Sequence, residues 1–181
     1  ENFNLEIIEL KKLDGYENEN YLITTKNKKY IFKKYPYSPE LETVIKGENE
    51  VLLFLSENNE KFPSPIKAVD GKYVQIHKIN GQKFICRMLS FLEGEMLGSI
   101  NNTKEMFESL GLFLGKMNQK LQSYNNNIIK SRVWHWDLRY FHLNKKFIDY
   151  IPKARDRSLV KYFFYQFEEN VSPLIPSLRK S

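Results

Sequence analysis

The segment KYIFKKY, residues 29–35, and the segment that follows it decide how this sequence folds. The first segment is rich in aromatic residues and isoleucine, which is typical of a strand, and it carries Lys33. In the second segment, residues 39–58, the apolar residues fall on one face of a helix, and Glu48 lies near the middle of that face. The apolar members of this face are Leu41, Val44, Ile45, Val51, Leu52 and Leu55.

Glu48 is the acidic residue of this helix that needs a partner. A carboxylate on an apolar helix face is costly to bury unless a cation meets it. Glu42 lies to one side of the face and Glu50 projects from the opposite side, so neither has this need. We predict that Glu48 forms an ion pair with Lys33; the alternative is a helix whose edge simply tolerates one charge.

Short strands fill the rest of the first half. Turn and strand signals predict strands at residues 7–13, 20–25, 29–35, 66–69, 73–79 and 83–91. The sequence Ser38-Pro39-Glu40 begins the helix, and Asn80-Gly81 marks a hairpin. Consecutive strands would pair as an antiparallel sheet with one helix packed on it. We therefore predict an α+β fold with a sheet lobe over residues 1–91.

Helices dominate after residue 94. Asn102 is predicted to cap a helix on which Gly111 and Gly115 suggest close approach to another element. A further, aromatic helix is predicted over residues 156–170, with Phe163 and Phe164 among its inward residues. Residues 92–181 are then a hinge followed by the first part of a helical lobe.

Composition excludes several classes of function. The 181 residues include 28 basic and 22 acidic ones, and the excess is dispersed, unlike the concentrated basic surface of a nucleic-acid-binding protein. The single cysteine, Cys86, rules out a disulfide framework, and the histidines lack metal-ligand spacing. No apolar run reaches membrane-spanning length. We expect a cytoplasmic protein with no nucleic-acid or membrane partner.

The order of these features resembles the aminoglycoside phosphotransferase and choline kinase group of the protein-kinase-like fold. The turn Gly15-Tyr16-Glu17-Asn18 is similar to the group's G-x-x-N, and residues 87–94 (RMLSFLEG) are similar to its hinge. Residues 110–117 (LGLFLGKM) are similar to its L-G-x-x-L-x-x-L helix. Within the group the resemblance is closest to hydroxylysine kinase, through residues 136–138 and 156–179.

The resemblance implies a phosphotransferase (kinase) that uses ATP and Mg²⁺. Lys33 would contact phosphate oxygens and be held by Glu48. The acceptor would be a hydroxyl of a small amine or amino alcohol such as hydroxylysine, ethanolamine or homoserine. The other residues implied in nucleotide binding are Gly15, Tyr16, Glu17 and Asn18 of the turn and Leu89, Ser90, Phe91 and Leu92 of the hinge.

The group's catalytic loop, H-G-D-x-x-x-x-N, is absent from the sequence and is expected after Ser181. The chain begins at Glu1 without a methionine, so we expect a fragment of a longer polypeptide, itself inactive and without catalytic or metal-binding residues. By the same resemblance, the parent protein could carry a downstream pyridoxal-phosphate phospho-lyase of the aminotransferase type.

The segment His135–Arg139 (HWDLR) is similar to a catalytic H-x-D-L motif. That motif requires an asparagine five residues after its aspartate, and here this position is His142. We therefore predict that Trp134, Trp136 and Asp137 have a structural or substrate-wall role. Two alternatives for the whole chain are a non-catalytic pseudokinase or nucleotide-binding interaction fragment, and a basic nucleic-acid-binding module.

Overall fold

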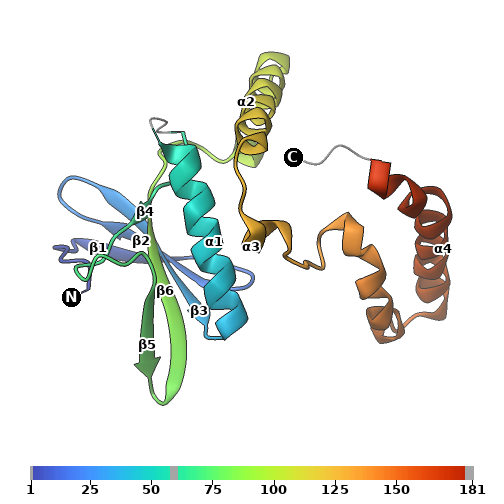
Figure 1. Ribbon diagram of the computed structural model, residues 1–181, viewed down its shortest axis with the longest axis horizontal. Coiled ribbons are helices and arrows are strands. Elements are labelled where there is room, and N and C mark those ends of the chain that lie inside the picture. Colours follow the sequence, from blue (N-terminus) through green and yellow to red (C-terminus); the bar gives the residue numbers. More distant parts are fainter. Residues whose placement is uncertain (1, 58–60, 178–181) are drawn as a thin grey trace. The chain divides into compact units, whose positions relative to one another are not determined.

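The first part of the chain folds into an antiparallel sheet with one helix against it (Figure 1). The computed structural model describes residues 2–57 and 61–177. Two compact units divide the chain, one of residues 1–130 and one of residues 131–181. The predicted boundary between the two lobes, at residue 91, lies inside the first unit. It falls between the last strand of the sheet and the helices that follow, and the division into lobes stays a prediction.

Strand β3 (Lys29–Pro36) lies at the centre of the sheet. The strand order is β1-β2-β3-β6-β4, with β5 also paired to β6, and every pair is antiparallel. The predicted antiparallel sheet is therefore confirmed. The remaining strands are β1 (Glu9–Leu13), β2 (Glu19–Thr24), β4 (Pro65–Ile66), β5 (Gln75–Ile79) and β6 (Gln82–Ser90), so the strands expected at 7–13 and 66–69 are shorter than predicted.

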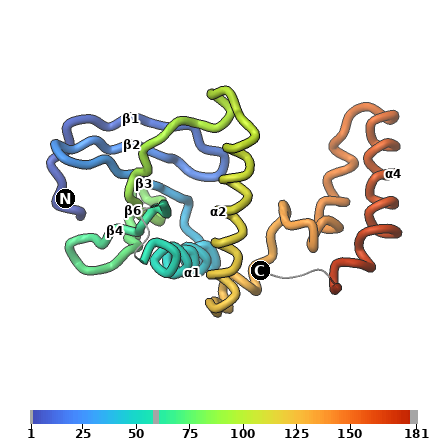
Figure 2. The backbone as a smooth tube through the Cα atoms, turned by 90° about the horizontal axis from the view of Figure 1, so that it is seen from above, coloured from blue at the N-terminus to red at the C-terminus, as the bar shows by residue number. Residues whose placement is uncertain are grey.

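Helix α1 (Pro39–Ser56) covers one face of the sheet (Figure 2). As predicted, it begins at Ser38, whose hydroxyl accepts a hydrogen bond from the Leu41 N–H at 3.1 Å. Its apolar face is buried through Ile45, which packs against Tyr35 of β3 and Ile85 of β6. The helix was expected to reach residue 58, which lies outside the described residues.

Helix α2 (Lys104–Gln122) follows a short 3-10 turn, η1 (Leu97–Ser99). Its cap is Thr103, and not the predicted Asn102, because the Thr103 hydroxyl accepts from the Met106 N–H. Two ring stacks connect this region to α1 and to the loop after α1. Phe54 of α1 stacks on Tyr124 with 4.3 Å between centroids, and Phe62 of the loop stacks on Phe113 of α2 at 5.2 Å.

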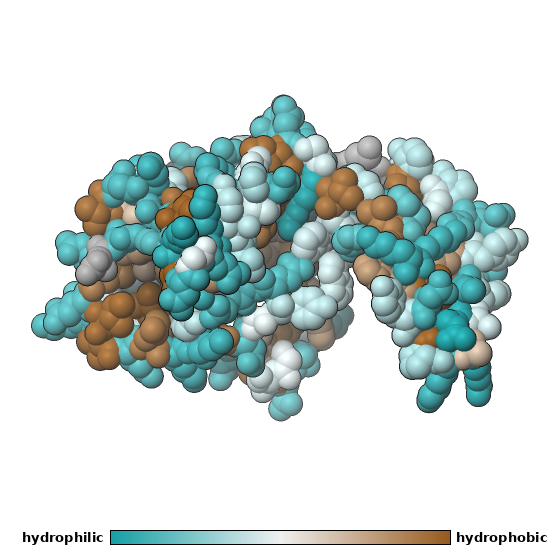
Figure 3. Space-filling model, turned by 90° about the horizontal axis from the view of Figure 1, so that it is seen from below, coloured by the Kyte–Doolittle hydropathy of each residue, from teal (hydrophilic) through white to brown (hydrophobic). Residues whose placement is uncertain are grey.

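The predicted close approach at Gly111 and Gly115 is wrong for the described residues. A Cβ added at either glycine would meet no described atom within 4 Å. Large apolar side chains on the same helix are also exposed. Hydrophobic residues reach the surface elsewhere too, and Figure 3 shows a brown patch at the left, on the side of the molecule that carries the sheet. The exposed apolar side chains of α2 are Phe107, Leu110, Leu112 and Leu114.

The close approach occurs instead at Gly47, in the middle of α1. A Cβ at Gly47 would lie 2.9 Å from the Ile128 side chain, which belongs to the short helix α3 (Asn127–Lys130). Asn126, which is buried, donates from Nδ2 to the Gly47 carbonyl at 3.2 Å and to Glu50 Oε2 at 2.9 Å, while its Oδ1 accepts from the Ile129 N–H. This contact fastens α3 to the back of α1.

The second unit consists of the 3-10 segments η2 (Leu138–Tyr150) and η3 (Ser172–Ser177) on either side of helix α4 (Ala154–Asn170). Its aromatic core forms where Phe141 packs on Phe164 and Phe167, with ring centroids 4.3 and 4.6 Å apart. The predicted helix exists, but Phe163 is 57% exposed and does not face inward. In neither unit is any described helix long and apolar enough to cross a membrane.

We predict that Gly47→Ala destabilises the protein although alanine favours a helix. The added methyl group would force Ile128 aside, and such overpacking costs about 1–3 kcal/mol. Gly111→Ala is the matched control, because its methyl group enters open space and should stabilise the helix by up to about 1 kcal/mol. Chemical denaturation of the two variants measures the difference; equal stabilities would contradict the Gly47–Ile128 contact.

Candidate functional site

Three polar side chains lie in a row across three neighbouring strands. Lys33 on β3 is paired in register with Asn20 on β2 and with Arg87 on β6. Residues paired in this way lie on the same face of an antiparallel sheet, so all three project to one side. Tyr35, two residues after Lys33 on the same strand, shares that face and packs against α1. The candidate site is therefore built on the helix-covered face of the sheet.

Glu48 reaches this row from α1, but its partner is Arg87. The Glu48 Oε2 accepts from Arg87 Nη2 at 2.7 Å, and Lys33 and Glu48 make no ion pair within the described residues. The predicted Lys33–Glu48 pair is thus replaced by a different one. The reason lies in burial and geometry: the Arg87 guanidinium is 6% exposed and needs a counter-charge, and its planar donors suit a carboxylate better than a single ammonium does.

Neutral partners complete the surroundings of Arg87. Its Nε and Nη2 donate to the Tyr35 hydroxyl at 3.2 and 2.9 Å, and its Nη1 donates to Asn49 Oδ1 at 2.9 Å. Burial raises the pKa of the Tyr35 hydroxyl, while the positive charge of Arg87 and its hydrogen bonds lower it. The Asn18 side chain also lowers this pKa by hydrogen bonding, which places the last residue of the predicted G-x-x-N turn beside the cluster.

The ammonium group of Lys33 is held in an unfavourable environment. Partial burial lowers its pKa most, repulsion by Arg87 lowers it further, and attraction by Glu48 acts in the opposite direction. Asn20, opposite Lys33, donates from Nδ2 to the Asp14 carbonyl at 3.3 Å, but its buried Oδ1 has no partner among the described residues. A lysine ammonium whose pKa is lowered by burial and by a neighbouring cation gains more electrostatic stabilisation from a bound anion than an exposed lysine does.

The turn between β1 and β2 is tight at Gly15. A Cβ there would lie 2.2 Å from the Asn18 carbonyl oxygen, a distance that no side chain can occupy. Of the other predicted turn residues, Tyr16 is 89% exposed and Glu17 is exposed. The turn is therefore closed by a tight contact of its own backbone at Gly15, while the residues Tyr16 and Glu17 are exposed.

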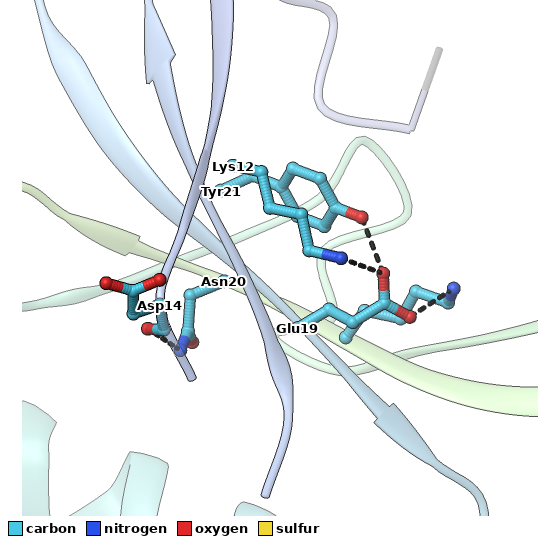
Figure 4. A network of polar contacts seen from close by, with 6 residues as sticks. Lys12, Asp14, Glu19, Asn20 and Tyr21 are labelled. Carbon is cyan, nitrogen blue, oxygen red and sulfur yellow. Dashed lines mark hydrogen bonds and ion pairs between the residues drawn. The ribbon is translucent and has the colours of Figure 1, made fainter. Parts of the chain in front are cut away.

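Glu19 anchors the start of β2 on the opposite face of the sheet (Figure 4). It accepts from the Tyr21 hydroxyl at 2.6 Å and pairs with Lys34 at 2.8 Å and Lys12 at 3.8 Å. The hydrogen bond from Lys34 is the main reason why the pKa of Glu19 is lowered. Lys34 thus belongs to this network, and its neighbour Lys33 projects to the other side.

The predicted hinge residues continue from the end of β6. Leu89 is buried, and the Ser90 N–H donates to the Ser64 carbonyl at 2.8 Å. The Phe91 N–H donates to the Lys29 carbonyl at 3.3 Å. Leu92 is 43% exposed, and the described hydrogen bonds leave its N–H available to a ligand.

Apolar residues adjoin Lys33 on its own face of the sheet. Ile31, two residues before Lys33, is paired in register with Leu22 of β2 and Leu89 of β6. The three form an apolar strip that lies between Lys33 and the hinge. A separate cavity of about 670 Å³ is lined by Ser90, Phe91 and Leu92 but not by Lys33, so we do not assign it to the same site.

The candidate residues of the second unit have structural partners. Asp137 caps η2 by accepting from the Arg139 N–H at 2.9 Å, and its side chain also bonds the Arg139 guanidinium, which is the main reason why the pKa of Asp137 is lowered. Arg132 lies 4.2 Å over the Trp134 ring, and Trp136 is 72% exposed. A substrate-wall role for these residues stays a prediction. Within the described residues, no group of His, Cys, Asp and Glu could hold a metal ion.

The model of one protein family matches residues 9–150, and this family is described as the phosphotransferase enzyme family, APH. The chain belongs to the APH phosphotransferase enzyme family. The match covers the sheet, α1, the hinge, α2 and the start of the second unit. No curated protein matches the sequence.

Solved structures show the same fold at low sequence identity. An amicoumacin kinase, hAmiN, in complex with AMP-PNP, Ca²⁺ and Ami has a TM-score of 0.69 at 20% identity, over 99% of this chain and 52% of its own. Spectinomycin phosphotransferase with ADP and spectinomycin has a TM-score of 0.57 at 15% identity, over 99% and 56%. A microcompartment-associated aminopropanol kinase has 0.55 at 15% identity, over 77% and 43%. The chain thus spans about half the length of these structures.

Sequence reasoning missed Arg87 and Asn20 in this member of the family. Arg87 lies within residues 83–91, which are predicted to be a strand, and a basic residue among apolar neighbours is the signal that could have identified it. Asn20 carried no comparable signal, because its role depends on the pairing register.

We predict that Lys33→Met raises the free energy of unfolding at neutral pH. The folded state lowers the pKa of Lys33, so the unfolded chain binds the proton more tightly and the charged lysine opposes folding. This penalty disappears as the pH rises through the lowered pKa toward the ordinary value of 10.5, so the gain should shrink in that window. Thermal melts from pH 7 to pH 10 measure it.

Lys34→Met is the matched control for this prediction. The hydrogen bond to Glu19 raises the pKa of Lys34, so its removal should leave stability equal or lower at neutral pH. A stability loss in Lys33→Met as large as that in Lys34→Met would contradict the inferred environment of Lys33.

Cys86 should resist thiol reagents in the folded protein. Burial raises the pKa of its thiol to about 11, so almost no thiolate is present at pH 8. Labelling by a chromogenic disulfide reagent should be slow in buffer and rapid in denaturant. Rapid labelling of the native protein would show that β6 opens readily.

Proposed function

We propose that the chain is the N-terminal part of an ATP-dependent small-molecule kinase that phosphorylates a hydroxyl group. The observation that carries this proposal is the lysine on the central strand, whose ammonium has a lowered pKa and lies beside an apolar strip that leads to the hinge. Family membership supports a phosphotransferase, and the succession of Lys33, apolar strip and hinge along the sheet supports the proposal of a bound nucleotide.

In this proposal the nucleotide lies along the Lys33 face of the sheet. The base and sugar would rest on Leu22 and Ile31, with the Leu92 N–H as a hydrogen-bond donor to the base. The phosphates would meet Lys33, and the backbone of the turn at Gly15 would cover them. Ser90 is not assigned a backbone N–H contact, because its N–H is already bonded to Ser64.

The nucleotide requires a divalent cation, Mg²⁺ in this proposal, to neutralise its phosphate charge. The described residues that fit the nucleotide supply one cation and backbone donors. The residues that hold the metal, and the catalytic base, would come from the loop expected after Ser181. The amicoumacin kinase and the spectinomycin phosphotransferase have chains about twice as long as this one, which supports the assignment of the metal-holding residues and the catalytic base to a later part of the polypeptide.

The acceptor would be a small amine or amino alcohol, with hydroxylysine, ethanolamine and homoserine as the first candidates. This finer assignment rests on the motif resemblance to hydroxylysine kinase, and the aminopropanol kinase among the similar structures is compatible with it. A cytoplasmic location and a downstream fused lyase-like domain are part of the same proposal.

We predict that a chain extended through the expected catalytic loop transfers phosphate from ATP to an amino alcohol, and that residues 1–181 alone do not. In the extended protein, Lys33→Met should lower kcat/KM by about a hundredfold or more, because a preorganised phosphate contact is lost. Lys34→Met is the control for the loss of a lysine on the same strand and should stay within about twofold. A coupled ADP-release assay over an amine and amino-alcohol panel measures both.

Two results would change the proposal. Lys33-dependent turnover by residues 1–181 alone would overturn the assignment of catalysis to the later loop. Binding of Mg-ATP by the extended protein, without phosphorylation of any member of the panel, would favour the pseudokinase alternative.

A further inference from the structure

A cavity of about 720 Å³ lies between α1 and the chain that leads into β5, at the edge of the sheet. One wall is residues 72–76, and the other is a stripe along one side of α1. This volume is typical of small-molecule sites in proteins. The cavity is lined by none of the residues that are assigned to the nucleotide, so it is a separate feature of the first unit. The α1 stripe consists of Glu42, Lys46, Asn49, Glu50 and Leu53.

Asn49 is the buried polar residue of this wall, and its amide is only half satisfied. The side chain belongs to a residue that is 3% exposed, and its Oδ1 accepts from Arg87 Nη1 at 2.9 Å. A guanidinium has donors only, so the oxygen of the amide must face Arg87 and the amide cannot be reversed. The Nδ2 has no hydrogen-bond partner among the described residues. A buried donor of this kind gains free energy from any acceptor that reaches it.

The cavity also offers apolar surface to a ligand. Leu53 contributes from α1, and Val74 and Ile76 contribute from the opposite wall. Val74 packs on the buried core of the first unit, which holds this wall in place, while Ile76 is 41% exposed. An apolar group that lies between the two walls would remove this surface from water.

The charged residues around the cavity oppose a charged ligand. Lys46 pairs with Glu42 at 2.6 Å, and Lys72 pairs with Asp70 at 3.5 Å. Glu50 accepts a hydrogen bond from a neutral amide at 2.9 Å. An anionic ligand would meet the carboxylates of Glu42 and Glu50, and a cationic ligand would meet the ammonium groups of Lys46 and Lys72. The walls therefore favour an uncharged molecule.

We propose that this cavity binds an uncharged small molecule that carries a hydrogen-bond acceptor, such as an amide carbonyl, on an apolar body. The acceptor would take a hydrogen bond from Asn49 Nδ2, and the body would lie on Leu53, Val74 and Ile76. Because the Oδ1 of the same amide accepts from Arg87, binding would also change the surroundings of the Arg87 guanidinium. Neither ATP nor Lys33 enters this inference, so it stands or falls apart from the proposed kinase activity.

The test compares benzamide, benzoate and benzylamine, which share a ring and differ in charge. Each is titrated into the ¹⁵N-labelled full-length protein and followed by NMR, and the Asn49 side-chain signals are identified by their loss in Asn49→Asp. Benzamide should shift these signals and the Arg87 Nε–H signal saturably, and bind at least about tenfold more tightly than the charged probes.

Three results of this titration would contradict the proposal. If no probe gives a saturable shift, the Asn49 donor is satisfied by water and the site is overturned. If benzoate or benzylamine binds as tightly as benzamide, the assignment to uncharged ligands is overturned. A shift at Asn49 without one at Arg87 would support the site and overturn its connection to Arg87.

Substitutions then test the Asn49 donor directly. Asn49→Asp keeps an acceptor for Arg87 and removes the amide donor, so it should weaken benzamide binding by about tenfold or more. Asn101→Asp makes the same change at an exposed residue outside the cavity and should leave the affinity unchanged. An unchanged affinity in folded Asn49→Asp overturns the proposal. Should Asn49→Asp not fold, Ile76→Asn is measured instead, because it removes apolar surface from the opposite wall; weaker binding supports the site, and a wild-type affinity overturns it.

Discussion

The contact between Arg87 and Glu48 is the interaction on which the rest of this site depends. It joins the strand before the hinge to the helix that covers the sheet, across a distance of 2.7 Å, and it is enclosed by the Tyr35 hydroxyl and the Asn49 amide. A buried arginine cannot lose its charge, so it must keep a carboxylate nearby. Any movement of α1 away from the sheet would strip Arg87 of that carboxylate and of Asn49 together.

Lys33 derives its properties from this arrangement. Its ammonium is partly buried, faces Arg87 in register and receives only part of the attraction of Glu48. At neutral pH the charged Lys33 lowers the free energy of unfolding of the protein, and a bound anion would raise it again. The site therefore carries a cost in the free protein that a bound phosphate would offset, a pattern expected where a protein binds a charged ligand.

Contacts at two glycines hold the elements around this site. Gly15 allows the turn between β1 and β2 to close on the Asn18 carbonyl, and Gly47 allows α3 to approach the back of α1 through Ile128 and Asn126. The face of α1 that carries Glu48 and the side that meets α3 are thus both fixed within the first unit. Family membership accounts for the order of these elements.

The sequence by itself determined the elements and their order. Local signals were sufficient to predict the antiparallel sheet and its helix. These signals are the short strand segments separated by turns, the start of α1 at Ser38-Pro39, and the apolar helix face that contains Glu48. The sequence also showed that Glu48 needs a cation. Its error at Asn102, where Thr103 caps α2, was a shift of one residue between two adequate caps.

Only the tertiary structure decided which cation Glu48 meets and which residues stand beside Lys33. Those partners depend on the pairing register of β2, β3 and β6, since a shift by one residue would turn every side chain to the other face. Lys33 and Arg87 both lie on the face of the sheet that α1 covers, and the more deeply buried arginine forms the ion pair with Glu48. That choice reflects desolvation, a property of the packed structure that no spacing along the chain contains.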